Sequence, residues 1–220
     1  DDFVNLMDLA PTFLELGGVQ PPKVMTGRSL VPVLKSKANG LVDAERNWVI
    51  TGRERHVARA RADFLGYPQR ALRTPDYLYI INFKPERWPM GDPYHLKAAK
   101  KPDYNTLANN TFVTYGDLDA SPTKAWLMQH GHEAKWKWHY DYAFGKRPRI
   151  ELYDLKNDPD QLKNVAGKPQ FVAAQKQLHT RLMAELKRTA DPRVNGDGST
   201  FDKPPFVSDF NRRPRKPKKQ

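Results

Sequence analysis

The chain has 220 residues, of which 39% are hydrophobic and 11% aromatic, and this content excludes a chain that is disordered throughout. It has no cysteine, so disulfides, thiolate metal sites and a cysteine nucleophile are excluded within this sequence. No segment approaches the roughly 18 consecutive apolar residues of a transmembrane helix, which predicts no membrane span.

The formal net charge of +12 is concentrated at the C-terminal end. Residues 211–220 hold six lysines and arginines, two prolines and no acid, and residues 193–220 as a whole are predicted to form a disordered basic tail. Such a tail is most often a solvated terminus. It can also bind nucleic acid or anionic glycans by releasing counterions, although we do not expect nucleic acid as the partner.

The N-terminal part predicts short helices. Asp8 suits the N-cap of a helix that runs to Leu16, and Pro11 is tolerated in its first turn. Three apolar residues at helical spacing are expected to form its core face: Leu9, Phe13 and Leu16. A further helical turn is expected over residues 29–34.

A short apolar run, Trp48–Thr51, predicts a strand, and a charged cluster of Arg53, Glu54, Arg55 and His56 follows it. Ligands of open α/β sheets bind just beyond the carboxyl ends of strands. Arginine offers a planar fork that matches anionic oxygens, and histidine can donate, accept or carry a proton near neutral pH. The cluster therefore indicates a pocket for a sulfated, phosphorylated or carboxylated ligand. A solvated charged loop is the alternative interpretation.

Two more strands are expected over residues 69–73 and 77–83. The turn chemistry of Thr74-Pro75-Asp76 between them predicts a β-hairpin. Residues 89–110 are expected to form a long irregular excursion.

The C-terminal half predicts a helix over residues 122–130 with Ser121 as its cap. Aromatic residues spaced by two over residues 133–142 favour a strand that packs in the core, with a glycan-stacking surface as the alternative. A strand over 150–155 and a helix over about 169–189 complete the predicted elements. The histidines of residues 130–139 lack the spacing of a metal site, and no metal is expected there.

Several short matches, in order, resemble the type I sulfatase family of the alkaline-phosphatase-like superfamily. They are Asp8-Leu9-Ala10-Pro11-Thr12, Gly27-Arg28-Ser29-Leu30, the segment from Phe144 to Pro148, and Glu151-Leu152-Tyr153-Asp154-Leu155 with Asn157-Asp158-Pro159. The cluster at residues 53–56, the Gly66-Tyr67-Pro68 loop and the segment 82–89 are similar to the heparan N-sulfatase (sulfamidase) branch. The resemblance covers roughly residues 4–190 and points to the C-terminal part of such an enzyme.

The resemblance implies an α/β fold: the end of a sulfatase-like mixed sheet plus a C-terminal subdomain in which a long C-terminal helix packs on a small antiparallel sheet. It implies three segments: 1–56 as the end of the catalytic domain, 57–192 as the C-terminal subdomain and 193–220 as the tail. The partners of the strand at Trp48–Thr51 are expected in the upstream part.

The family's formylglycine nucleophile, made from a cysteine or serine, has no motif here. That nucleophile and the Ca²⁺ ligands are expected upstream, so this segment alone is predicted to be inactive and to hold no catalytic or metal-binding residue. The resemblance implies a hydrolase of sulfated glycans, with N-sulfoglucosamine-type substrates, whose sugar is contacted by Arg53, Glu54, Arg55 and His56. It also implies the N-terminal part of the same protein as a partner and a periplasmic or secreted location.

Two alternatives remain at this point. One is a phosphohydrolase of the same superfamily, which would carry an upstream serine or threonine and two zinc sites. The other is a basic module that binds polyanions without catalysis, with its affinity in the tail.

Overall fold

The computed structural model of the chain describes residues 1–97 and 99–206, so the basic segment 211–220 lies outside the described residues. The chain divides into two compact units. Unit 1 comprises residues 1–51, 70–80 and 150–182, and unit 2 comprises residues 52–69, 81–149 and 183–220. The three-segment division at residues 56 and 192 stays a prediction.

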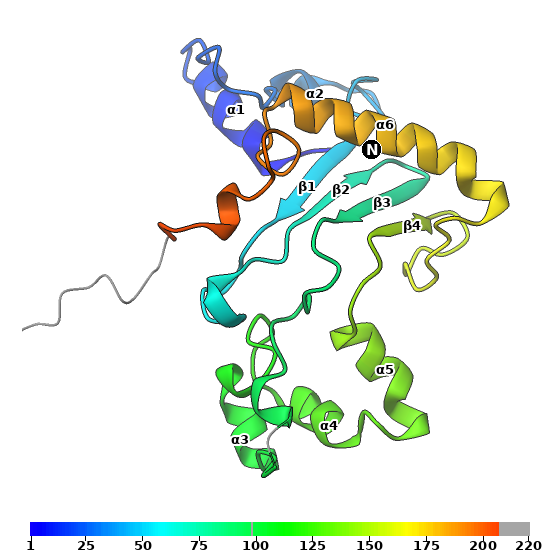
Figure 1. Cartoon of the computed structure of the whole chain (residues 1–220). Coiled ribbons are helices and arrows are strands. Elements are labelled where there is room, and N and C mark those ends of the chain that lie inside the picture. Colours follow the sequence, from blue (N-terminus) through cyan, green and yellow to red (C-terminus); the bar gives the residue numbers. More distant parts are fainter. Residues whose placement is uncertain (98, 207–220) are drawn as a thin grey trace, which may run out of the picture. The chain divides into compact units, whose positions relative to one another are not determined.

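Unit 1 is built on a four-stranded antiparallel sheet in the order β1-β2-β3-β4 (Figure 1). The strands are β1 (Val49–Arg53), β2 (Gln69–Arg73), β3 (Tyr77–Asn82) and β4 (Ile150–Asp154). The predicted hairpin is present, and its turn is closed by the Thr74 N–H, which donates to the Tyr77 carbonyl at 2.9 Å. β1 pairs with β2 within this chain, which differs from the expectation that its partners lie upstream.

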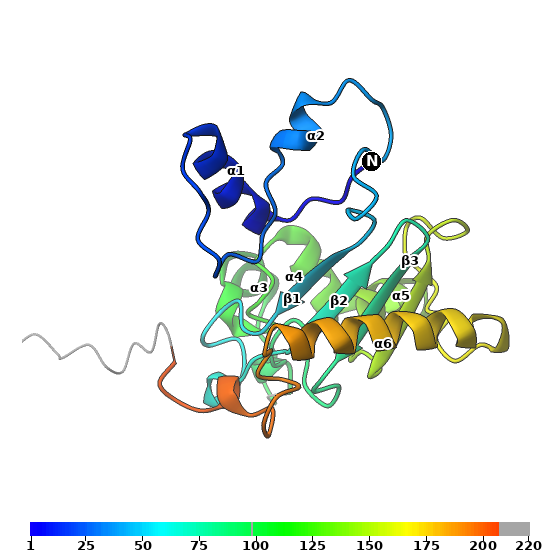
Figure 2. The same cartoon turned by 90° about the horizontal axis from the view of Figure 1, so that it is seen from above.

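The long helix α6 (Val172–Arg188) lies across one face of this sheet, as Figures 1 and 2 show. The Tyr79 hydroxyl on β3 is 2.8 Å from His179 Nδ1 on the helix. The Arg181 guanidinium lies over the Trp48 ring at 4.6 Å, just before β1. Leu178 and Leu182, one turn apart on α6, are buried. The predicted fold class, with a small antiparallel sheet packed by a long C-terminal helix, is confirmed.

The N-terminal part of unit 1 contains η1 (Leu6–Asp8), α1 (Leu9–Leu16) and α2 (Val31–Lys35). The side chain of Asp8 does not cap α1, in contrast to the prediction. It instead accepts from the Arg28 N–H at 2.8 Å and pairs with the buried Arg46 guanidinium at 2.8 Å. Burial alone would raise the pKa of Asp8, but these donors outweigh it and lower the pKa below its usual value.

The predicted core face of α1 is exposed in this structure: Leu9, Phe13 and Leu16 are 38%, 65% and 61% accessible. The buried residues of the helix are Pro11 and Thr12. Thr12 Oγ1 accepts from the Leu30 N–H at 2.8 Å, and this bond turns the polar side of the helix toward α2.

Unit 2 holds the helices α3 (Tyr104–Asn109), α4 (Pro122–His130) and α5 (Ala134–Phe144). Its short 3-10 turns are η2 (Ala62–Phe64), η3 (Tyr94–Lys97), η4 (Thr111–Val113) and η6 (Thr200–Asp202). Leu107, Val113 and Ala125 form a small core between α3, η4 and α4. Ser121 caps α4 as predicted, by accepting from the Lys124 N–H at 3.1 Å. The excursion 89–110 is less irregular than predicted, because it contains η3 and α3.

The predicted strand over residues 133–142 is wrong, because this segment forms α5. Aromatic residues spaced by two are also spaced by four, and four residues make about one helical turn. Tyr140 and Phe144 share one side of the helix and both pack on the buried Tyr115 ring, with the Tyr115 and Tyr140 hydroxyls 2.7 Å apart. The aromatic packing thus serves helix docking within unit 2.

Candidate functional site

The loop from Gly52 to Pro68 in unit 2 carries the predicted cluster. Its two ends are clamped together, since the Tyr67 N–H donates to the Glu54 carbonyl at 2.6 Å. A Cβ at Gly66 would lie 2.6 Å from that same carbonyl oxygen, so the close approach requires glycine.

Arg53 is half-buried and contacts other residues of unit 2. Its Nη2 donates to the Pro89 carbonyl at 2.7 Å, and its guanidinium lies over the Tyr67 ring at 5.6 Å. Burial lowers the pKa of Arg53 below its usual value. These contacts tie the start of the loop to the segment around Pro89.

Glu54 is engaged by Arg193, whose Nη2 lies 2.6 Å from one carboxylate oxygen. Arg193 is almost fully buried and also pairs with Asp202 at 3.1 Å. Burial alone would lower the pKa of Arg193, but its bonds to Glu54 and Asp202 outweigh burial and raise it. Arg193 and Asp202 thus make ion pairs within unit 2, and the tail predicted over residues 193–220 stays a prediction.

Arg55 and His56 complete the cluster. Arg55 Nη1 donates to the Phe64 carbonyl at 2.9 Å, and its guanidinium lies over the Phe206 ring at 4.5 Å. His56 is the exposed member of the four, while the other three are half-buried. Contact of these four residues with a substrate stays a prediction.

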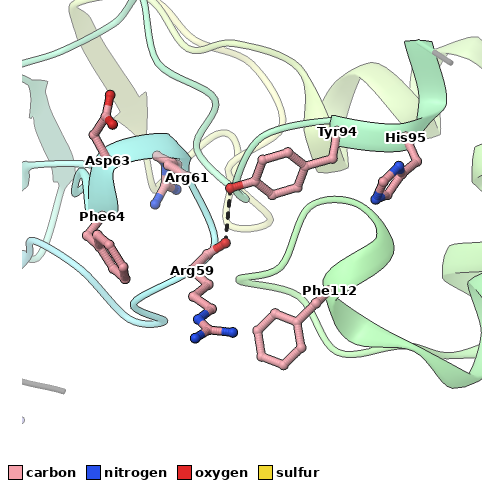
Figure 3. A pocket seen from close by; sticks show the side chains of 7 residues that line it. All are labelled: Arg59, Arg61, Asp63, Phe64, Tyr94, His95 and Phe112. Carbon is pink, nitrogen blue, oxygen red and sulfur yellow. Dashed lines mark hydrogen bonds between the residues drawn. The ribbon is translucent and has the colours of Figure 1, made fainter. Parts of the chain in front are cut away.

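A pocket of about 480 Å³ lies in unit 2, and sequence reasoning missed it. Figure 3 shows its lining: Arg59, Arg61, Asp63, Phe64, Tyr94, His95 and Phe112. Arg59 and His95 are exposed and supply a cation and an imidazole that can donate or accept a hydrogen bond. The volume is in the range of about 300–1,000 Å³ that small-molecule sites occupy. Its mixture of basic and aromatic side chains suits an anionic sugar, whose ring has apolar faces.

A buried ion pair holds the wall of this pocket. Arg61 Nη2 pairs with Asp117 at 2.7 Å, and both side chains are at most 2% exposed. Arg61 also donates to the carbonyls of Trp88 and Pro89, while Asp117 accepts from the Val57 N–H at 3.0 Å. The loop carrying Arg59 is thereby fixed to two other segments of unit 2.

Close backbone packing supports the same wall. Gly91 has a φ of +98°, and a Cβ there would lie 2.7 Å from the Ala60 carbonyl oxygen and 2.8 Å from the Gly116 nitrogen. The Asp92 N–H donates to that Ala60 carbonyl at 2.7 Å. Only glycine allows three chain segments to meet at this point.

Three pocket residues other than glycine have a positive φ: Asp63 at 54°, Phe64 at 58° and Tyr94 at 26°. Such conformations cost of order 1–3 kcal/mol each and cluster at functional sites. Tyr94 is held by its hydroxyl, which donates to the Arg59 carbonyl at 3.1 Å (dashed in Figure 3). Burial and the carboxylates of Asp92 and Asp63 raise the pKa of Tyr94, so the hydroxyl keeps this proton. No glycine or asparagine marks these positions in the sequence, which is why the pattern gave no signal.

Metal binding is not assigned to this chain. Among residues 1–97 and 99–206, no three His, Cys, Asp or Glu side chains are grouped so that they could hold a metal ion. The calcium ion and the formylglycine nucleophile stay predictions about the region upstream. In the same described part, no helix is long and apolar enough to cross a membrane.

Comparison with known proteins points to sulfatases, although no family model matches the chain. An ulvan-active sulfatase of Formosa agariphila is 25% identical over 194 residues, which cover 87% of this chain and 30% of that protein. Human N-sulphoglucosamine sulphohydrolase is 27% identical over 204 residues, covering 87% of this chain and 34% of the relative. A solved structure described as a complex with its substrate D-glucosamine-2-N,6-O-disulfate has a TM-score of 0.48 and 20% identity, over 86% of this chain and 25% of that one.

The resemblance to sulfatases is confirmed: the homologues that cover most of this chain are sulfatases, hydrolases of sulfate esters or sulfamates. The chain spans only about a third of the length of these two relatives.

Proposed function

We propose that the protein to which this chain belongs is a sulfatase that hydrolyses sulfated glycans, and that the pocket and the loop 52–68 form part of its substrate-binding wall. The observation that carries the proposal is the similarity to sulfatases over 87% of the chain. The proposed substrate is an N-sulfoglucosamine-type glycan. An ulvan-type sulfated polysaccharide is the alternative substrate, because one relative is named for N-sulphoglucosamine and the other for ulvan.

The contacts within unit 2 divide the roles in the loop. Arg53 and Glu54 are engaged by Pro89 and Arg193, so we assign them to holding the loop. His56 is exposed, and half-buried Arg55 donates to the Phe64 carbonyl with its guanidinium over the Phe206 ring. In the proposal, Arg55 and His56 contact the sulfated sugar and orient it by charge complementarity.

In the pocket, Arg59 and His95 would bind the sulfate or carboxylate oxygens. The rings of Phe64, Tyr94 and Phe112 would cover the apolar face of the sugar. The nucleophile and its calcium ion would come from the upstream part.

The upstream part of the same protein is also the partner that we propose for unit 1. Five residues of η1 and α1 expose apolar side chains: Leu6, Met7, Leu9, Phe13 and Leu16. Exposed apolar side chains close together along the chain are consistent with contact with another protein surface. A glycan substrate is consistent with a periplasmic or secreted location, which is likewise proposed.

The test is kinetic, with the full-length protein. Removing a charge-assisted contact costs on the order of 1.5–3 kcal/mol, so His56→Ala and Arg59→Ala should each lower kcat/KM by roughly ten- to a hundredfold. Their melting temperatures should stay unchanged, because both side chains are exposed. An exposed lysine of unit 1, changed as Lys168→Ala, is the matched control.

Substrates should be an N-sulfated glucosamine, a 6-O-sulfated glucosamine and a sulfated ulvan fragment. If both variants keep wild-type kcat/KM, the proposed substrate-binding site is refuted. If the wild-type protein turns over none of the sulfated substrates, the proposed sulfatase function is refuted. Preference for the ulvan fragment would replace the substrate assignment only.

A further inference from the structure

Helices α4 and α5 of unit 2 carry a continuous group of aromatic rings that the pocket does not use. We name it the aromatic face, and its members are Trp126, His130, Trp136, Trp138, His139 and Tyr142. Two pairs are stacked one helical turn apart: Trp126 on His130, with centroids at 4.0 Å, and Trp138 on Tyr142, at 5.2 Å. Trp136 links the two helices, since it meets Trp126 edge-on at 6.3 Å and His139 at 5.7 Å.

In the described part, Trp126, Trp138 and His139 are exposed, and the other three rings are half-buried. Trp126 is 44% exposed and Trp138 is 53% exposed. Tyr140 and Phe144, on another side of α5, already anchor the helix to Tyr115. Leaving two tryptophans in water forgoes a large apolar burial, and exposed clusters of this type mark binding surfaces.

The aromatic face is flanked by positive charge. Lys135 Nζ lies over the Trp136 ring at 4.7 Å, and the Arg147 guanidinium lies over the Tyr142 ring at 5.2 Å. The two acids nearby already have partners within this surface: Glu133 Oε1 lies 2.6 Å from His130 Nδ1, and Asp141 pairs with Lys137. The surface therefore combines flat rings with the cations of Lys135 and Arg147.

We propose that the aromatic face binds a chain of sulfated polysaccharide at a site separate from the pocket. Pyranose rings present flat C–H faces that stack on indole and phenol rings, and sulfate groups match lysine and the planar fork of arginine. The two stacked pairs, Trp126 with His130 on α4 and Trp138 with Tyr142 on α5, are joined through Trp136 and His139 and so offer more than one ring on which a sugar could stack. The choice of a sulfated glycan rests on the proposed function, and the positive flanks favour it over a neutral polysaccharide.

The test uses the full-length protein and two measurements. Binding is measured by affinity electrophoresis in gels cast with heparin, with chemically desulfated heparin, or without polysaccharide. Turnover is measured on a sulfated glucosamine monosaccharide, which is too short to span both sites. The variants are Trp138→Ala and the charge-only pair Lys135→Gln with Arg147→Gln. Tyr104→Ala, an exposed aromatic of α3, and Lys168→Gln are the controls.

We expect each variant of the aromatic face to weaken heparin binding by roughly tenfold, while monosaccharide kcat/KM stays within about twofold of wild type. The controls should change neither. Desulfated heparin should retard wild type less than heparin does, because it has lost its sulfate groups and keeps only its carboxylates.

Unchanged heparin binding in both variants would overturn the proposal. A large fall in melting temperature for Trp138→Ala, with heparin binding unchanged in the charge-only pair, would also overturn it and would mean that the face packs inside the whole protein. Binding to phosphatidylserine vesicles that is lost in both variants, while heparin binding persists, would identify a membrane surface instead. Failure of wild type to turn over any sulfated monosaccharide would count against the proposed function alone, since heparin binding is measured separately.

Discussion

The buried ion pair between Arg61 and Asp117 offers a sharp test of how the pocket wall is held. Asp117→Asn keeps the size and shape of the side chain and removes its charge. The Arg61 guanidinium then stays buried without a carboxylate, although it still donates to the carbonyls of Trp88 and Pro89. The loss in free energy of unfolding is therefore set mainly by the buried Arg61 charge without a partner carboxylate, and only in part by the lost hydrogen bond.

The magnitude follows from the burial of both partners. Breaking a buried pair by removing one charge costs about 3–5 kcal/mol. The two remaining carbonyl acceptors place Asp117→Asn near the lower end, at about 3 kcal/mol. With about 2–4 °C per kcal/mol for a chain of this size, the melting temperature should fall by roughly 6–12 °C.

The assay is thermal unfolding followed by circular dichroism, with Asp160→Asn as the control, because Asp160 is an exposed aspartate in unit 1. The double variant Arg61→Met with Asp117→Leu should recover part of the loss, since an apolar pair of similar volume needs no charge compensation. A melting temperature of Asp117→Asn within 2 °C of wild type would correspond to a loss of at most about 1 kcal/mol, instead of about 3, and would refute the reasoning.

Three further predictions follow from unit 2. Gly66→Ala should lower the free energy of unfolding and loosen the loop that carries His56, because the alanine Cβ would lie 2.6 Å from the Glu54 carbonyl oxygen. Proteolysis within residues 52–68 should then be faster than in wild type. Lys124→Met should cost about 2–4 kcal/mol, because the buried ammonium donates to three backbone carbonyls that would lose their donor. Burial lowers the pKa of Lys124 from 10.5 to about 8, so between these pH values the unfolded chain binds more protons than the folded chain. The contribution of Lys124 to the free energy of unfolding should therefore rise with pH over this range. Urea titrations of Lys124→Met should lack this rise. The pKa of Asp202 lies below its ordinary value of 3.8, because the bonds to Arg87 and Arg193 outweigh burial. The contribution of Asp202 to stability should therefore be complete above about pH 4 and be lost on further acidification. Acid unfolding of Asp202→Asn should depend less steeply on pH than that of wild type.

The sequence by itself determined the local elements that short-range chemistry specifies. The hairpin followed from the Thr74-Pro75-Asp76 turn, the cap of α4 from Ser121, and the long helix α6 from apolar residues at helical period. The ordered set of short matches also identified the sulfatase relatives, because motifs keep their order along a chain even when overall identity is low.

Periodicity failed where two periods coincide. Aromatics at every second position of residues 133–142 fit a strand and a helix equally, and packing of Tyr140 and Phe144 on Tyr115 selected the helix. Tyr115 is distant in sequence, so no local pattern contained this choice. For the same reason the exposed face of α1 was assigned to the core: the bond from the Leu30 N–H to Thr12, which orients the helix, spans 18 residues.

Only the tertiary structure decided which charges hold the fold and which face outward. Glu54 and His56 lie two residues apart in one cluster, yet Arg193, 139 residues further along the chain, engages the first, while the second is exposed. The pocket likewise draws its lining from segments around Arg59, Tyr94 and Phe112 that no sequence pattern links. Charge and residue type are properties of the sequence, whereas burial and pairing depend on contacts between distant segments. The decisive energies, desolvation and ion pairing, therefore arise only when the chain has folded.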